Sequence, residues 1–227
     1  FLTRAVNGLN EPTDFAYSTT AKSCYGSSAL TYNYPNARQT SAYSIVSSMA
    51  RPSAAGFSGS PALEITNYQY EDLVVNKMGR GLLGFQKVTA LSSVTGRSVE
   101  QSFSIDPTYF IKLPVKTRTL YGQQLLQQVT NSYILVNKDI AGNLGLSVRK
   151  RYQLHLTASS ALNAIRNIAI NSAMSYDNDG NLTQQSVNVL GKQQSSTSYN
   201  SYIAAGSWLP NKPQTVVTQN TYDGQSP

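Results

Sequence analysis

The chain has 227 residues, a net charge of +7 and one cysteine, Cys24. A single cysteine excludes an internal disulfide framework and a cysteine-rich zinc site, and we expect its thiol to be buried or idle. The excess of basic residues permits nucleic-acid binding, but they are scattered apart from the cluster Arg149 to Arg151. Because scattered charge is typical of a solvated face, we predict no nucleic-acid partner. No apolar run is long enough for a transmembrane helix, so we also predict no direct membrane insertion.

The composition favours β structure. Charged residues make up 13% of the chain, about half the usual share, and 15 tyrosines accompany many Ser, Thr, Asn and Gln residues. Tyr, Thr and Val favour pleated, half-buried surfaces. Turn signals recur along the whole chain, and short strands between such turns predict an all-β fold. These signals are Asn7-Gly8, Pro35-Asn36, Ser58-Gly59, Gly79, Gly96, Asp106-Pro107, Gly122, Gly142-Asn143, Asp179-Gly180, Gly191 and Asp223-Gly224.

The first distinctive strand pattern places Tyr68 and Tyr70 on one face, and a glycine-rich stretch follows it. In this stretch three glycines flank Arg80 and precede Phe85. Glycines there predict a bulge or sheet bend, where two backbones come close. A phosphate-binding glycine loop would need a helix after it, whereas Phe85 to Thr89 is strand-like. The three glycines are Gly79, Gly81 and Gly84.

Three further segments in the middle of the chain show strand patterns. Phe103 and Ile105 share a face before Asp106. Tyr133 to Val136 is apolar on both faces, which predicts a strand covered on both sides. Arg151 to Leu156 alternates, with Tyr152, Leu154 and Leu156 on an apolar face and Arg151, Gln153 and His155 on a polar face.

The lone histidine, His155, therefore falls on a polar face. A single histidine without nearby carboxylates or thiols is not a metal site, and the chain has no Gly-x-Ser-x-Gly elbow. We expect His155 to be a surface or hydrogen-bonded structural residue. Ala158 to Met174 fits both a helix and a strand, and we interpret it as a strand because its asparagines weaken a helix.

An Asp/Asn-rich turn follows at Tyr176 to Thr183. Asp179-Gly180 predicts a two-residue hairpin with both central residues at positive φ. Asp177 and Asn181 belong to the same cluster, and alternating Asp and Asn can bind calcium. The EF-hand pattern fails because Asn188 stands where its last glutamate is needed, so turn chemistry explains the cluster better.

Two of these stretches resemble RHS/YD-repeat proteins. The first is TNYQYEDLVVNKMGRGLLGFQKVTALSSVTGR, Thr66 to Arg97, and the second is YDNDGNLT, Tyr176 to Thr183, followed by Gly191. The piece GSWLPNKP, which contains Trp208, is also similar, and TYDG, Thr221 to Gly224, resembles the opening of a further repeat. The resemblance is to the B component of insecticidal Tc toxin complexes and to related RHS-type virulence proteins, and it covers the chain from about residue 30 onward.

The resemblance implies consecutive antiparallel β-hairpins that form part of a hollow β-shell. Residues 1–227 would be one continuous segment, with a hairpin run in 1–115 and YD-repeat hairpins in 116–227. The partners implied are the rest of the same shell or other toxin-complex subunits, and an enclosed toxin polypeptide. The role implied is structural and secreted, with no enzymatic activity and no cofactor. We expect the chain to be a piece of a longer protein.

Two other function classes stay open. An all-β adhesin or carbohydrate-binding module would use exposed tyrosines and Trp208, because aromatic faces stack on sugars. A glycosidase would need two carboxylates close together. Glu11, Glu64, Glu71 and Glu100 are too few and too isolated in the sequence to nominate such a pair.

Overall fold

The computed structural model describes residues 1–22, 24–28, 30–53, 63–138, 151–190, 194–202 and 212–222. Every regular element in these residues is a β-strand, which confirms the all-β expectation. None of them forms a helix long and apolar enough to cross a membrane. The chain divides into two compact units, Phe1–Leu125 and Leu126–Pro227. The interpretation as one segment with a change of repeat after residue 115 stays a prediction.

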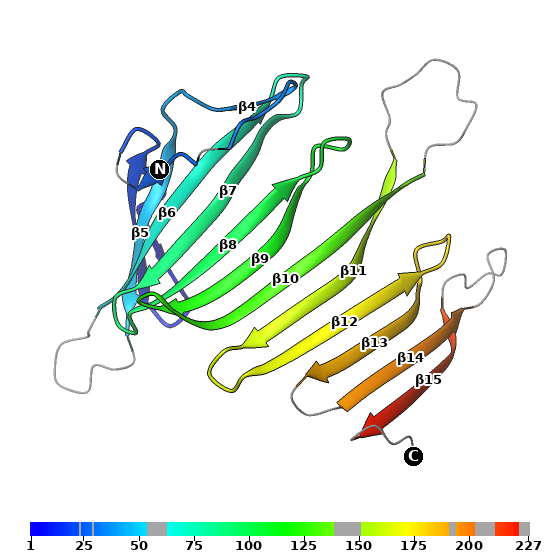
Figure 1. Cartoon of the computed structure of the whole chain (residues 1–227). Coiled ribbons are helices and arrows are strands. Elements are labelled where there is room, and N and C mark those ends of the chain that lie inside the picture. The colour runs from blue at the N-terminus through cyan, green and yellow to red at the C-terminus, as the bar shows by residue number, and fades with distance from the viewer. Residues whose placement is uncertain are drawn as a thin grey trace. The chain divides into compact units, whose positions relative to one another are not determined.

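The first unit is a sheet whose strands follow one another antiparallel for most of their order, β1-β2-β5-β6-β7-β8-β9 (Figure 1). Two short strands, β3 and β4, leave this path and both pair with β6. The strands are β1 (Arg4–Val6), β2 (Pro12–Thr19), β3 (Tyr25–Gly26), β4 (Asn36–Arg38), β5 (Ser44–Pro52), β6 (Leu63–Asn76), β7 (Gly81–Ser92), β8 (Arg97–Ile105) and β9 (Lys112–Tyr121).

The long strand β6 organises the core of this unit. Its first part pairs with β5, at Leu63 to Asn67, and its second part pairs with β3 and β4, at Tyr70 to Asn76. The chain between β2 and β5 therefore folds back beside the second half of β6. The buried apolar residues of the described chain all lie in this unit: Ile45, Leu73, Val74, Tyr109, Leu113 and Leu120.

The glycine-rich hairpin between β6 and β7 carries the predicted bulge. Val74 pairs with Gly84 and Val75 pairs with Leu82, so β7 holds one extra residue, Leu83. Gly84 has a φ of 99°, a left-handed conformation that L-residues adopt with strain, and an added Cβ there would lie 3.1 Å from the Lys112 Nζ. The interpretation of this stretch as a bulge, with a strand after it, is confirmed.

The second unit is an antiparallel series of six consecutive strands (Figure 1). Residues 158–174, interpreted as one strand, are in fact parts of two strands joined by a hairpin. Asn163 and Asn167 make this turn: the Asn163 Oδ1 accepts from the Arg166 N–H at 3.0 Å, and Asn167 has a φ of 50°. The strands are β10 (Gln124–Asn137), β11 (Tyr152–Asn163), β12 (Ile168–Tyr176), β13 (Leu182–Leu190), β14 (Gln194–Tyr202) and β15 (Pro213–Tyr222).

The second unit has almost no interior in its described residues. His155 is its one buried side chain there. The expectation that Tyr133 to Val136 is covered on both faces is wrong, because Ile134 is 50% exposed. Apolar residues on both sides of a strand therefore do not identify a second layer here. The strands β10 to β15 also contain no Asp, Glu, Lys or Arg; the charges of the described part lie in the turns or next to strand ends.

Candidate functional site

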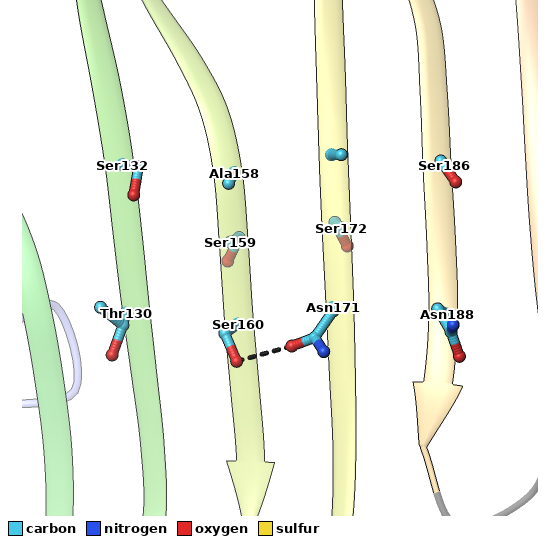
Figure 2. A pocket seen from close by; sticks show the side chains of 10 residues that line it. Thr130, Ser132, Ala158, Ser159, Ser160, Asn171, Ser172, Ser186 and Asn188 are labelled. Atoms are coloured by element: carbon cyan, nitrogen blue, oxygen red, sulfur yellow. Dashed lines mark hydrogen bonds between the residues drawn. The ribbon is translucent and has the colours of Figure 1, made fainter.

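One face of the second unit carries small uncharged side chains that line up across four strands (Figure 2). Register pairs join them into two rows, because residues directly opposite each other point to the same side of a sheet. We call these residues the polar face. The first row is Thr130, Ser160, Asn171 and Asn188, and the second is Ser132, Ala158, Ala173 and Ser186.

The polar face forms a shallow groove of about 400 Å³. The Ser160 Oγ donates a hydrogen bond to the Asn171 Oδ1 at 2.7 Å, as the dashed line in Figure 2 shows. Hydroxyl and amide groups can donate and accept hydrogen bonds but supply neither acid–base chemistry nor strong charge. The described residues also include no group of three His, Cys, Asp or Glu side chains that could hold a metal ion. The groove is therefore suited to contact with an uncharged surface.

His155 lies on the side of β11 that the structure buries. Its ring stacks on Tyr176, with centroids 4.3 Å apart, and the Tyr176 hydroxyl donates to the Leu156 carbonyl at 3.0 Å. Leu154, on the opposite side, is 44% exposed. The assignment of polar and apolar faces along β11 is thus wrong, because ring stacking on Tyr176 covers His155 while Leu154 is the exposed side chain.

The Asp/Asn-rich turn is built around Asp177. Its Oδ1 accepts from the backbone N–H groups of Asp179 at 2.9 Å and Asn181 at 2.8 Å, and its Oδ2 accepts from the Asn181 Nδ2 at 2.9 Å. The side-chain hydrogen bond from Asn181 and those from the backbone lower the pKa of Asp177. All of these bonds stay within the turn, as turn chemistry predicts.

The hairpin type differs from the one predicted. Gly180 has a φ of 89°, while Asp179 does not have a positive φ. The Gly180 N–H donates to the Asp177 carbonyl, and the Asp177 N–H donates to the Asn181 carbonyl. This is a three-residue loop with a glycine bulge, which needs one left-handed residue where a two-residue type I′ turn needs two. The Gln153 Nε2 and the Lys138 Nζ donate to the carbonyls of Asp179 and Asn178 and fix the loop to neighbouring strands.

In the first unit, the predicted aromatic motif packs on β6 and β7. The rings of Tyr70 and Phe85 lie 4.6 Å apart, and Tyr68 stacks beside Tyr70 at 6.4 Å. The Tyr70 hydroxyl donates to the Val46 carbonyl at 2.9 Å, and burial raises the pKa of Tyr70 to about 12. Arg80 lies exposed in the turn between the two strands. These residues act together as a packing cluster between neighbouring strands.

Sequence reasoning missed the most buried charge in the described chain, Asp72 on β6, which is 0% exposed. The Arg38 Nε lies 2.8 Å from its Oδ1, a charge contact without good hydrogen-bond alignment. The Ser28 N–H and hydroxyl both donate to the Asp72 carboxylate. Tyr32 lies next to the same pair, and its burial, with the Asp72 charge, raises its pKa to about 12. The signal was an aspartate directly before the apolar run Leu-Val-Val, where a charge needs a partner.

The structure therefore brings the predicted motif residues into two separate groups, one in each unit. Tyr68, Tyr70 and Phe85 pack together beside the glycine bulge, and Tyr176 leads into the turn made by Asp177, Gly180 and Asn181. Gly191 and Trp208 lie outside the described residues, as do the predicted turns at Ser58-Gly59, Gly142-Asn143 and Asp223-Gly224.

Comparisons with known proteins give little further guidance. No family model matches the chain, and no curated protein matches it. Among solved structures, the chain is similar to a porin-like protein from Bacteroides uniformis, at 10% identity, over 97% of this chain and 94% of that chain. The TM-score of that match is 0.21, so it carries no argument. No family is shown.

Proposed function

We propose that this chain is a wall segment of an RHS-type hollow β-shell that encloses a toxin polypeptide in a secreted bacterial complex. The observation that supports this most directly is the second unit: six consecutive antiparallel strands whose described residues bury one side chain, His155. A sheet normally has to cover its apolar side with a second layer, and repeated hairpins can meet this need by adjoining further copies. Such a sheet fits a wall better than an independent globular domain.

The polar face supports the enclosing role. A wall around an unfolded polypeptide must contact many different side chains without binding any of them tightly. Ion pairs and large apolar contacts would give tight binding, whereas small hydroxyl and amide groups exchange their partners with water at little net gain. Neither the first nor the second row of the polar face contains a charged residue. In this proposal, the polar face lines the lumen.

A protease-protection experiment tests the proposal. The native protein that contains this chain is purified together with its enclosed polypeptide and treated with proteinase K, and the free polypeptide serves as the reference. We expect the enclosed polypeptide to survive while the free one is degraded, and we expect electron micrographs to show hollow particles. Equal degradation rates, or solid particles, would reject the shell.

Replacing Ala173 by Arg sharpens this test. Ala173 lies in the second row of the polar face, between Ala158 and Ser186. A long cation there should hold acidic segments of an enclosed polypeptide and slow its release, while protease protection persists. Arg166→Ala, which changes a charge in the β11–β12 turn, is the matched control and should leave release unchanged.

A separate measurement tests the alternative that the chain is a carbohydrate-binding module. The groove offers hydroxyl and amide groups that could bind sugar hydroxyls, but the described residues lining it include no aromatic ring for stacking. Binding to a glycan array that is lost on Trp208→Ala, together with no protease protection, would favour the adhesin over the shell.

A further inference from the structure

The turn between β6 and β7 projects from the first unit, beyond the aromatic packing cluster. Residues 77–82 are all exposed, and they include two large apolar side chains, Met78 at 64% and Leu82 at 47%. A Cβ atom added at Gly79 or Gly81 would have no atom beyond its chain neighbours within 4 Å. Open space therefore surrounds this turn within the described chain.

Hydrogen bonds hold the turn against the loop that precedes β4, and the two lie side by side in Figure 1. The Lys77 N–H donates to the Pro35 carbonyl at 2.8 Å, and the Met78 N–H donates to the Asn76 Oδ1 at 2.9 Å. Tyr34, directly before Pro35, is 76% exposed. The exposed apolar side chains are thus presented together by a bonded pair of loops.

The exposed charges of this turn are all positive. Lys77 and Arg80 lie in the stretch 73–84, which contains no Asp or Glu, and the loop before β4 contains none either. Neither cation forms an ion pair in the part of the chain that the structure describes. Asp72, just before this stretch, is 0% exposed and is paired with Arg38. We call the following residues the basic tip: Tyr34, Lys77, Met78, Arg80 and Leu82.

We propose that the basic tip docks onto an anionic membrane surface, with its cations among the lipid headgroups and its apolar side chains in the interface. Such binding grows with the apolar area that leaves water and with the attraction between basic residues and anionic lipids. Tyrosine suits the interface because its ring is apolar and its hydroxyl is polar. The contact is peripheral, and no strand has to enter the hydrocarbon core. The inference goes beyond the proposed function and does not depend on it.

The shape of the basic tip favours a lipid surface over an acidic polypeptide. A peptide held by its side chains needs a groove or a free strand edge, whereas open space surrounds Gly79 and Gly81. A fluid lipid surface can accept a projecting turn. The turn at the other end of β7, residues 93–96, gives the contrast: Val94 is 50% exposed there, but that turn contains no charged residue.

Sedimentation of the 227-residue chain with vesicles of phosphatidylcholine, with and without phosphatidylserine, tests the proposal. We expect binding to the phosphatidylserine vesicles that weakens with added salt and that Arg80→Glu weakens by at least about fivefold. Arg97→Glu is the matched control, because Arg97 is exposed, lies beside the far end of β7 and gives the same change in net charge. It should weaken binding by less than about twofold, since salt screens distant charges.

Three results of this experiment overturn the proposal. The first is no binding to the phosphatidylserine vesicles. The second is an equal loss in Arg80→Glu and Arg97→Glu, which would assign the binding to the net charge of the chain. The third is binding to polyglutamate that Arg80→Glu removes, without binding to vesicles, which would identify an acidic polypeptide as the partner.

A fluorescent label reports whether the tip enters the interface without changing its cations. On a Cys24→Ser background, an environment-sensitive dye is attached to Met78→Cys and, in a separate protein, to Val94→Cys. We expect phosphatidylserine vesicles to shift the emission of the first label to shorter wavelength and to leave the second unchanged. A chain that sediments with the vesicles while the label at Met78→Cys stays in water overturns the proposal.

The two proposals can fail independently. A chain that binds vesicles through the basic tip, in a protein whose polypeptide is not protected from protease, leaves the membrane contact standing and rejects the shell. A protected polypeptide together with a chain that never binds vesicles does the reverse.

Discussion

The two units are built by the same antiparallel strand succession, yet they differ in what surrounds their strands. In the first unit the segment between β2 and β5 folds back beside β6 and buries Leu73 and Val74. In the second unit no described segment provides such a cover, and Leu154 and Ile134 are about half exposed. The comparison shows that strand pairing alone does not create an interior; a chain segment that leaves the strand order does.

Charge is distributed in the same unequal way. In the first unit, Lys87 bridges Glu71 at 3.0 Å and Glu100 at 3.7 Å, and Arg118 contacts Glu100 at 3.2 Å. Cross-strand ion pairs oppose a shift of register, because a shift separates the partners. In the second unit the corresponding contacts are hydrogen bonds between small polar groups, such as the one between the Ser198 and Thr218 hydroxyls at 3.0 Å. Such contacts specify the register more weakly than ion pairs do.

The largest expected loss of folding stability comes from removing the buried charge of the first unit. Asp72→Ala removes the charge partner of Arg38 and the acceptor of the Ser28 N–H, and removing one member of a buried ion pair costs about 3–5 kcal/mol. Urea unfolding followed by tyrosine fluorescence measures this change. Asp14→Ala, which breaks the exposed pair with Arg4, is the control and should leave the midpoint unchanged. Equal shifts for both variants would show that the Asp72 cluster does not hold β3 and β4 in place.

Much of the fold could be predicted from local patterns. The turn glycines Gly96 and Gly122 have positive φ, as turn residues should, and the bulge beside Gly84 follows from its glycines. Local patterns could not show which strand faces are buried. The alternation predicts a polar face for His155, because Arg151 and Gln153 share that face, whereas ring stacking on Tyr176, from the next strand, buries the histidine.

The candidate site was harder to predict than the fold. The polar face depends on the register between four strands, and its residues are separated by up to 58 positions, from Thr130 to Asn188. Ser, Thr, Asn and Ala residues form no recognisable sequence motif here. The two rows can be identified once the residue pairs between neighbouring strands are known. The Asp72 cluster likewise joins residues far apart in sequence, since Ser28 lies 44 positions away.

An intermediate loss of stability is expected when one leucine in each unit is replaced by alanine, and its size should differ between the two units. Leu73 is 4% exposed in the first unit, and its replacement by alanine should cost about 2–5 kcal/mol, as for other buried leucines. Leu154 is 44% exposed in the second unit, and the same replacement should cost less than about 1 kcal/mol, because it removes little buried area. Urea midpoints of the two variants give the comparison. A large cost at Leu154 would mean that this side of β11 is covered in the native protein.

The smallest expected effect is a pH dependence confined to the β12–β13 turn. The pKa of Asp177 is lowered by hydrogen bonds from Asn181 and the turn backbone, so its carboxylate stabilises the turn above its unfolded pKa of about 3.9. This contribution is lost as the pH falls through the lower folded pKa, because protonation removes the charged acceptor. The turn is solvated, and we therefore expect local opening without global unfolding.

Amide exchange at Asn181 measured by NMR should accelerate at acidic pH beyond its intrinsic pH dependence, and Asp177→Asn should abolish this excess acceleration. An excess that persists in Asp177→Asn would assign the pH dependence to another group, with Asp179, in the same loop, as the next residue to replace.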